Sequence, residues 1–251
     1  MIHRINNDTK IIVATFYAFC DLGDLTKLQT TLIQLFKDMG IKGTVLLAKE
    51  GINSTISGSR AGIDNVILFF ESIGLMEKLM YKESLSDDYP FDRIKVKIKP
   101  EIVTFKQDVD VHNLKGTYLN SEEWDALMED PNAIIIDTRN DFEVQIGTFK
   151  NAVNPKIERF TEFATWLEDN FENLKDKKVG MMCTGGIRCE KATAYLKKLG
   201  HDEVYHLHGG ILEYFIEGEN KKGNWIGGCF VFDDRKVLDD HQNTLGLPEN
   251  N

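Results

Sequence analysis

The sequence predicts two domains, an α+β domain followed by an α/β domain with a mainly parallel sheet. In the first part, "RIKVKIK" (93–99) alternates strictly between charged and apolar residues, which is typical of a strand with one covered face. In the second part, "AIIIDTR" (133–139) begins with a continuous apolar run, which is typical of a strand covered on both faces. Residues 106–120, between these runs, show no sustained period. We therefore expect a domain at 1–105, a linker at 106–120, a domain at 121–223 and a C-terminal tail at 224–251.

The first domain is expected to follow the order strand, helix, strand, strand, helix, strand. Asp24 is positioned to cap the first helix, and Gly40 stands where a C-terminal glycine belongs. The second helix is expected to end near Gly74. The expected strands are 11–19, 43–48, 52–57 and 93–99. This β-α-β-β-α-β order is that of a ferredoxin-like sandwich.

The second domain is expected to alternate strands with helices, which implies a mainly parallel sheet covered on both faces. Ser121 is positioned to cap its first helix, whose first turn is acidic. In such sheets the reactive groups gather at the carboxyl ends of the strands. Cys183 and Asp137–Arg139 are expected there. The remaining elements are a strand at 133–139, a helix near 160–172, a strand at 178–183, a helix near 189–199 and a strand at 203–207.

The stretch "MMCTGGIRC" places a thiol where a strand passes through a glycine-rich turn into a helix. Cysteine reacts as its thiolate, and an ordinary cysteine is mostly protonated near neutral pH. The unpaired N–H groups of a helix N-terminus favour an anion. Thr184, Gly185 and Gly186 allow successive backbone N–H groups to turn towards one centre, and Arg188 adds a positive charge. We therefore predict an anion-binding loop with Cys183 as the nucleophile at its floor.

Other interpretations of the cysteines are open. A buried cysteine at a strand end is often a small apolar packing residue. Cys189, in the first helical turn, suits packing as well as it suits a resolving thiol. Cys20 and Cys229 have no comparable surroundings and are predicted to be structural. A Cys–His pair with His206 or His208 is less favoured, because "YHLHGGI" is typical of a strand-to-helix turn.

Composition and charge argue against a membrane-spanning protein, a secreted disulfide-rich protein and a protein that binds nucleic acid through its overall charge. No apolar run approaches the roughly 20 residues of a membrane helix, and the N-terminus lacks the apolar core of a secretory signal. Four cysteines, spaced unlike a zinc site or a disulfide framework, suit a reducing cytoplasm. Residues 1–105 hold equal numbers of basic and acidic side chains, so residues 106–251 carry the whole net charge of −10. Bulk charge argues against nucleic-acid binding but leaves room for a local basic face on the first domain.

Three motifs of residues 121–223 resemble those of a rhodanese domain: "IIIDTRNDFEVQIGTFKNAVN", "MMCTGGIRC" and "VYHLHGGI". The resemblance implies that Cys183 is the catalytic cysteine and carries a persulfide. Asp137 and Arg139 match the family's Asp-x-Arg at a strand end, a structural and electrostatic support. Relatives with phosphatase activity have about five residues between Cys and Arg, and the shorter spacing here disfavours that activity. The loop that would cradle the outer sulfur or a substrate anion comprises Thr184, Gly185, Gly186, Ile187 and Arg188.

Over nearly the whole chain, "FYAFCDLGDL", "GTVLLAKEGINSTISG", "IKVKIKPEIVTF" and "CTGGIRCEKA" together resemble the rhodanese-containing tRNA uridine hydroxylase family. The resemblance implies oxygen-dependent hydroxylation of the anticodon wobble uridine at C5 to give 5-hydroxyuridine. Molecular oxygen would be the co-substrate and tRNA the partner. No metal-ligand cluster and no flavin or nicotinamide fingerprint is visible, so we expect no bound metal or cofactor, and the electron donor is open. The alternatives are a rhodanese-type sulfurtransferase that moves persulfide sulfur to an acceptor, and a non-catalytic RNA-binding adaptor.

A basic stripe on the first domain is the predicted tRNA contact. Strand geometry puts side chains of one parity on one face, and a row of positive charges suits phosphates. The stripe consists of Arg93, Lys95, Lys97 and Lys99. The alternative is an edge strand that lysines protect against aggregation. Phe16, Tyr17 and Phe19 could stack on bases, but core packing is the expected role for most of them.

Overall fold

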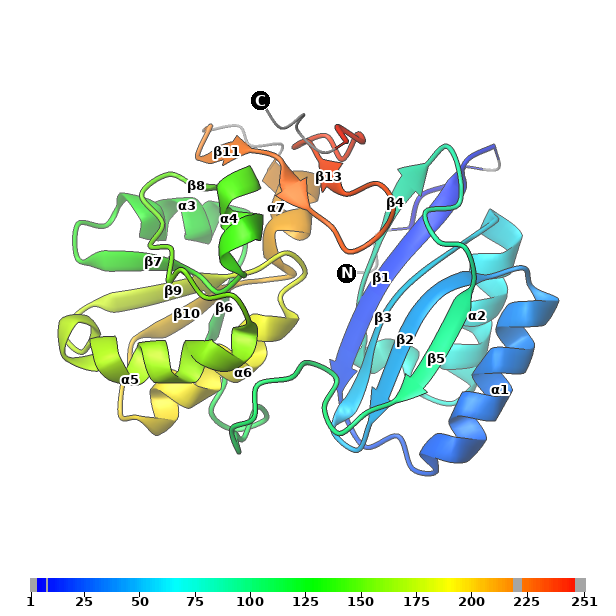
Figure 1. The fold of residues 1–251 in the computed structure, drawn as a ribbon, viewed down its shortest axis with the longest axis horizontal. Helices are drawn as coiled ribbons and strands as arrows, with labels where there is room; N and C mark the ends of the chain where they lie inside the picture. The colour runs from blue at the N-terminus through cyan, green and yellow to red at the C-terminus, as the bar shows by residue number, and fades with distance from the viewer. Residues whose placement is uncertain (1–3, 8, 219–222, 247–251) are drawn as a thin grey trace. The chain divides into compact units, whose positions relative to one another are not determined.

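The computed structural model describes residues 4–7, 9–218 and 223–246. The chain divides into two compact units, Met1–Val103 and Thr104–Asn251, and each has its own sheet and helices (Figure 1). Within the described ranges, no helix combines the length and the apolar composition needed to cross a membrane.

The first unit is a five-stranded sheet with two long helices. Its elements are β1 (Ile11–Phe19), α1 (Leu25–Asp38), β2 (Lys42–Ala48), β3 (Gly51–Gly58), α2 (Arg60–Ser72), the 3-10 helix η1 (Met76–Lys78), β4 (Met80–Ser86) and β5 (Ile94–Ile98). The strand order is β4-β1-β3-β2-β5, with antiparallel pairs apart from the parallel pair β2–β5. The predicted ferredoxin-like architecture is confirmed, with one additional strand at the edge.

The structure corrects the identity of the fourth ferredoxin-like strand. The strand that pairs with β1 is β4, whereas the predicted strand 93–99 forms β5 at the edge, beside β2. β4 lacks a clear apolar period because two charged side chains, Lys82 and Glu83, occupy buried positions. Glu83 accepts hydrogen bonds from Arg60 Nη1 at 2.7 Å and from the Tyr81 hydroxyl at 2.6 Å. A buried polar network, rather than an apolar side chain, fills this position.

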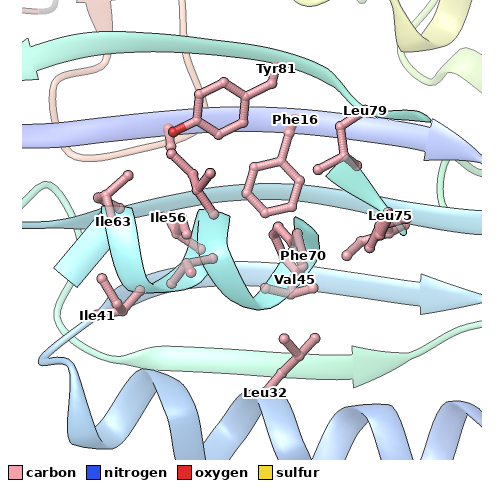
Figure 2. Packing of buried hydrophobic residues seen from close by; sticks show 14 of the residues in the cluster. Phe16, Leu32, Ile41, Val45, Ile56, Ile63, Phe70, Leu75, Leu79 and Tyr81 are labelled. Carbon is pink, nitrogen blue, oxygen red and sulfur yellow. The ribbon is translucent and has the colours of Figure 1, made fainter. Parts of the chain in front are cut away.

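Apolar side chains close one face of the first sheet. Figure 2 shows side chains of the helices and the strands meeting in this core. Phe16 of β1 packs edge-to-face against Phe70 of α2, with ring centroids 5.3 Å apart. As predicted, Asp24 caps α1, and its side chain accepts from the backbone N–H groups of Thr26 and Lys27.

The second unit holds a four-stranded parallel sheet with helices on both faces. Its elements before residue 219 are β6 (Thr117–Leu119), α3 (Ser121–Glu129), β7 (Ala133–Asp137), α4 (Asp141–Ile146), β8 (Gly147–Phe149), η2 (Phe160–Glu162), α5 (Phe163–Leu174), β9 (Lys178–Met182), α6 (Ile187–Lys198), β10 (Val204–Leu207) and α7 (Gly210–Gly218). The strand order is β6-β10-β9-β7. Helices α5 and α6 lie on one face, and α3 and α7 lie on the other (Figure 1). The predicted parallel α/β fold is confirmed.

Both ends of this unit differ from the expectation. β6 lies in the segment expected to be a linker (106–120). Three short strands, β11 (Trp225–Gly227), β12 (Cys229–Phe230) and β13 (Val237–Leu238), lie in the segment expected to be a tail. Trp225, Cys229 and Leu238 belong to the apolar core of the unit. Strands this short show no measurable period of two, so their pairing was not visible in the sequence. Residues 219–222 and 247–251 of the expected domain and tail lie outside the described residues.

Two helix starts also differ from the expectation. Asn120, rather than Ser121, caps α3. Its side chain accepts from the Glu123 N–H, and the Glu123 carboxylate accepts from the Asn120 N–H. Helix α6 begins at Ile187, earlier than the expected start near residue 189. Arg188 therefore lies in its first turn together with Cys189.

Candidate active site

The cysteine loop joins β9 to α6. Cys183 directly follows β9, and Gly186 is the N-cap of α6 with φ 98°, a left-handed conformation that favours glycine. The turn brings the Gly186 N–H to within 3.1 Å of Cys183 Sγ. Cys183 is 1% exposed. On the loop itself, a Cβ added at Gly185 would meet no atom within 4 Å, so the loop is open at that point.

The N-terminus of helix α7 makes hydrogen bonds to the backbone of the cysteine loop. The Ile211 N–H donates to the Cys183 carbonyl at 3.0 Å, and the Leu212 N–H donates to the Thr184 carbonyl at 3.1 Å. These donors are the otherwise unpaired N–H groups of the α7 N-terminus. Gly210 has φ 71°, and a Cβ there would lie 2.4 Å from the Cys183 carbonyl oxygen. The "HGGI" motif therefore has a physical role, because only glycine allows α7 to approach the loop this closely.

Arg188, which the sequence predicted to add positive charge to the loop, is paired with a buried carboxylate. Its guanidinium donates to Glu143 Oε2 from Nη1 at 2.7 Å and to Glu143 Oε1 from Nη2 at 2.8 Å. Glu143 is fully buried. Burial by itself would raise the pKa of Glu143, but Arg188 holds this pKa below its ordinary value. The positive charge of Arg188 is thus largely compensated before any substrate binds.

Glu143 is the site residue that the sequence analysis missed. It lies at the third position of α4, where it also accepts from the Asn140 N–H at 3.1 Å in a capping box. The spacing of Asn140 and Glu143 is the one local signal that pointed to this carboxylate, but a capping box predicts only a helix start. Its approach to Arg188, 45 residues further along the chain, is a tertiary contact.

Asp137 and Arg139 form a second buried ion pair, at the carboxyl end of β7. Arg139 Nε donates to Asp137 Oδ1 at 2.9 Å and Nη2 donates to Oδ2 at 2.6 Å. Both side chains are fully buried, and the Thr148 hydroxyl also donates to Asp137 at 2.8 Å. Arg139 Nη2 further donates to the Gly147 carbonyl at 2.5 Å. The pair thereby ties the end of β7 to β8, across the turn and short helix that carry Glu143.

Cys189 lies in the same buried site as Cys183, and both cysteines bond to Gly186. The Cys189 N–H donates to the Gly186 carbonyl at 3.1 Å, and the Gly186 N–H donates to Cys183 Sγ at 3.1 Å. Cys189 is fully buried, and its Sγ lies 3.8 Å from the Thr138 hydroxyl, which donates to the Met182 carbonyl at 3.0 Å. The sequence left Cys189 open between packing and chemistry, and the structure places its thiol in the buried site of the predicted nucleophile.

The surroundings of Cys183 favour its thiolate. Burial would raise the pKa of Cys183, but the hydrogen bond from Cys189, the charge of Arg188 and the backbone N–H groups of Arg188 and Gly186 together lower it to about 5. Burial, the hydrogen bond to Cys183 and the charge of Cys183 raise the pKa of Cys189. One proton is therefore shared unequally, with Cys183 as the thiolate and Cys189 as the thiol.

The other cysteines and the candidate histidines differ from Cys183. Burial raises the pKa of Cys229 to about 12, and burial is also the main cause that raises the pKa of Cys20, which lies in the first unit. His206 is buried and stacks on Tyr118 with ring centroids 4.3 Å apart. Burial lowers the pKa of His206 to about 3, so its imidazole is neutral. In the described part of the chain, no group of three or more His, Cys, Asp or Glu side chains is arranged to hold a metal ion.

The predicted tRNA-binding stripe lies in the first unit, on and around the edge strand β5. Val96 is buried in the core, and Gln29 of α1 donates to its carbonyl at 2.9 Å. The basic side chains are exposed: Arg93, Lys95, Lys97 and Lys99. Among the aromatic residues considered for base stacking, Phe16 and Tyr17 are buried and Phe19 is half-buried. Phe16 belongs to the apolar core of the first unit, as expected.

Comparisons with known proteins find a matching family model for each unit. Residues 11–102 match the UPF0176 acylphosphatase-like domain, and residues 120–217 match the rhodanese-like domain. Similar solved structures include a rhodanese-related protein from Thermoplasma volcanium, 25% identical over 41% of this chain and 93% of that chain, with a TM-score of 0.33. They also include the human single-domain sulfurtransferase TSTD1, 21% identical over 41% of this chain and 97% of that chain, with a TM-score of 0.35. The chain thus joins a UPF0176 acylphosphatase-like N-terminal domain to a rhodanese-like domain, which together cover most of its length.

Proposed function

We propose that this protein hydroxylates the anticodon wobble uridine of tRNA at C5, with molecular oxygen as co-substrate and Cys183 as the reactive group. The observation that carries the proposal is the cysteine loop, where backbone N–H groups and a neighbouring thiol stabilise the Cys183 thiolate. An inert packing cysteine needs none of these donors. The motifs that resemble the tRNA uridine hydroxylase family extend over both units, which supports this reaction rather than general sulfur transfer.

Different residues of the site position the Cys183 sulfur and set the charge around it. The loop and α7 hold the Cys183 sulfur in a fixed place. Glu143 fixes the Arg188 guanidinium and compensates its charge. If Cys183 carries a persulfide, as rhodanese-type cysteines do by resemblance, the same N–H groups would stabilise the outer sulfur as an anion.

Two exposed surfaces support contact with tRNA. The basic side chains of β5 project from the sheet edge, although the protected-edge alternative suits the same position. In the second unit, Phe142 and Phe232 are 45% and 66% exposed, and each packs edge-to-face against Phe230. Phe142 is the neighbour of Glu143 in the chain. Exposed rings beside a reactive site suit the stacking of unpaired bases.

The second candidate is a sulfurtransferase that loads sulfur on Cys183 and passes it to an acceptor. The observation that favours it is the rhodanese-like domain itself, with its cysteine loop intact. The two candidates share the nucleophile and differ in the product, so product analysis separates them.

Nucleoside analysis of tRNA from a deletion strain tests the proposal. We expect 5-hydroxyuridine to be lost, to return with the wild-type gene and to stay absent with Cys183→Ser, because a hydroxyl forms neither a thiolate nor a persulfide near neutral pH. Cys20→Ser, which changes a half-buried cysteine of the first unit, is the matched control. Loss of a thiolated nucleoside instead would favour the sulfurtransferase, and unchanged tRNA would favour the adaptor.

A further inference from the structure

We propose that Cys183 and Cys189 form a thiol–disulfide couple that supplies two electrons during turnover. The couple itself rests on the placement of both thiols in one buried site, on either side of Gly186. Its use in turnover rests on the proposed oxygen-dependent hydroxylation, for which the chain needs an electron donor.

The two thiols are placed as partners. Both bond to Gly186, whose N–H donates to Cys183 Sγ at 3.1 Å and whose carbonyl accepts from the Cys189 N–H, and their residues are 1% and 0% exposed. Cys189 is also fixed from its other sides, since its Sγ lies 3.8 Å from the Thr138 hydroxyl and its N–H donates to the Gly186 carbonyl at 3.1 Å. The loop between the two cysteines contains Gly185 and Gly186, whose backbone freedom would allow the small movement that a disulfide requires.

The charges of the site make Cys189 respond to the state of Cys183. In the reduced protein, the thiolate of Cys183 is one of the causes that keep Cys189 protonated. In the proposed turnover, O2 gives one oxygen atom to uridine and the other to the Cys183 sulfur, which becomes a sulfenic acid and loses its negative charge. Cys189 then loses its proton more easily and attacks the sulfenic sulfur, so that the S–S bond forms, the S–O bond breaks and the hydroxyl group leaves with the Cys189 proton as water. Oxidation of the first thiol thereby activates the second.

The electron balance of the proposed reaction matches this couple. Hydroxylation of a C–H bond by O2 puts one oxygen atom into the product and reduces the other to water, which consumes two electrons and two protons. Closing a disulfide from two thiols releases the same number. The sum is U–H + O2 + 2 R–SH → U–OH + H2O + R–S–S–R, in which uridine and the thiols are oxidised and O2 is reduced. A dithiol reductant from solution would reopen the disulfide for the next cycle.

Arg188 makes the disulfide easy to detect, because trypsin cleaves between the two cysteines. Reduced protein gives separate peptides, residues 179–188 with Cys183 and residues 189–191 with Cys189. The oxidised couple joins them. The reduced full-length protein is treated with one equivalent of hydrogen peroxide, its remaining thiols are blocked with N-ethylmaleimide, and the digest is analysed by mass spectrometry. We expect the joined peptide in the wild type and in Cys20→Ser, and its absence in Cys189→Ala.

A second arm tests the electron supply. Reduced protein, freed of external thiols, is mixed with an anticodon stem-loop in air-saturated buffer. We expect 5-hydroxyuridine and the joined peptide to rise together in equal amounts and to stop at one turnover, and dithiothreitol to restore further turnovers. In Cys189→Ala, whose fold is checked by circular dichroism, the single-turnover yield should fall at least about tenfold.

The outcomes separate the two claims. If peroxide never joins the two peptides in the wild type, the couple is overturned, whatever the protein does to tRNA. If the peptides join under peroxide and 5-hydroxyuridine forms without the disulfide, the electron-donor role is overturned. If the peptides join but tRNA from the deletion strain keeps its 5-hydroxyuridine, the couple is supported and the proposed hydroxylation fails.

Discussion

Cys183 lies among groups that favour its thiolate, yet the arginine nearest to it is already paired. The sequence suggested a bowl with a free positive charge. Instead, Arg188 makes two hydrogen bonds to Glu143, which compensate its charge. The remaining groups that stabilise the Cys183 thiolate are backbone N–H groups and the Cys189 thiol. Such a site stabilises one negative charge on sulfur better than it would bind a multiply charged anion.

Alkylation of Cys183 against pH measures the first consequence. The thiolate is lost as the pH falls through the pKa, so the rate constant should be flat from about pH 6.5 to 8 and fall below, with a midpoint near the value of about 5 given above. The measurement is made with iodoacetamide in a Cys20→Ser background. Cys189→Ala should raise the midpoint, because one donor to the thiolate is removed. A midpoint at or above about 8.5, the ordinary cysteine value, would contradict this account of the loop.

Glu143→Gln should change the charge that a reagent meets at Cys183. Glutamine keeps the shape but leaves Arg188 uncompensated, so the rate ratio of anionic iodoacetate to neutral iodoacetamide should rise, by about 3- to 10-fold. The free energy of unfolding should fall by about 3 kcal/mol, because a buried ion pair loses one partner. Glu158→Gln, at an exposed carboxylate of the same unit, is the control for both measurements. An unchanged ratio in Glu143→Gln would show that Arg188 does not act on the sulfur.

At the scale of the element, the cysteine loop depends on α7 as much as on its own residues. The loop residues make the turn, but two of their carbonyl groups find their donors on the N-terminus of α7. Gly210 allows α7 to lie this close to the loop, because any side chain at this position would meet the Cys183 carbonyl oxygen. Helix α7 is thus a structural support for the nucleophile.

Gly210→Ala tests that support. Its Cβ would stand 2.4 Å from the Cys183 carbonyl oxygen, so α7 must move away from the loop. Gly200→Ala is the matched control, because Gly200 also has a left-handed φ of 100° but a Cβ there meets no atom within 4 Å. We expect Gly200→Ala to lose about 1–2 kcal/mol of stability in urea denaturation from backbone strain, and Gly210→Ala to lose more, because its Cβ also meets backbone atoms of the loop. Only Gly210→Ala should also slow the alkylation of Cys183, and equal alkylation rates would contradict the role of α7.

The edge strand β5 carries the second prediction at this scale. If its basic side chains bind phosphates, Lys95→Gln/Lys97→Gln should weaken tRNA binding. The slope of log affinity against log salt should also become shallower by roughly 0.7 to 0.9 per contact removed. Lys175→Gln/Lys177→Gln, which removes one exposed and one half-buried charge of the second unit, is the control. Unchanged affinity and slope, with more aggregation, would show that the lysines only protect the sheet edge.

At the scale of the whole molecule, the two units have separate sheets and separate apolar cores. Each has about the size at which a single domain folds alone. We therefore expect residues 1–103 and residues 104–251 to unfold cooperatively as separate proteins. The second fragment should keep the low alkylation midpoint of Cys183, and the first should keep the salt-dependent binding of RNA. A second fragment without a cooperative transition in circular dichroism would show that its site needs the first unit.

The sequence by itself determined the two fold classes, most of the long helices and strands, and the local chemistry of the loop. Strand β9, the glycine turn and the start of α6 are contiguous, so apolar runs, glycines and the helix start predicted Cys183 and its donors before any tertiary contact was known. The parallel sheet was predicted because apolar strand patterns alternate with helical patterns along the second unit. Asp24 was predicted as a cap because its hydrogen bonds reach only the next turn.

Only the tertiary structure decided which distant groups meet. β4 was hidden because Glu83 and Arg60, not an apolar side chain, fill a buried position, and β6 and β11–β13 are too short to show a period. Glu143 reaches Arg188 across 45 residues. Periodicity reports whether a side chain is buried, but it does not report which partner buries it. The compensation of the Arg188 charge and the contact between Cys183 and Cys189 therefore come from packing, which no local pattern encodes.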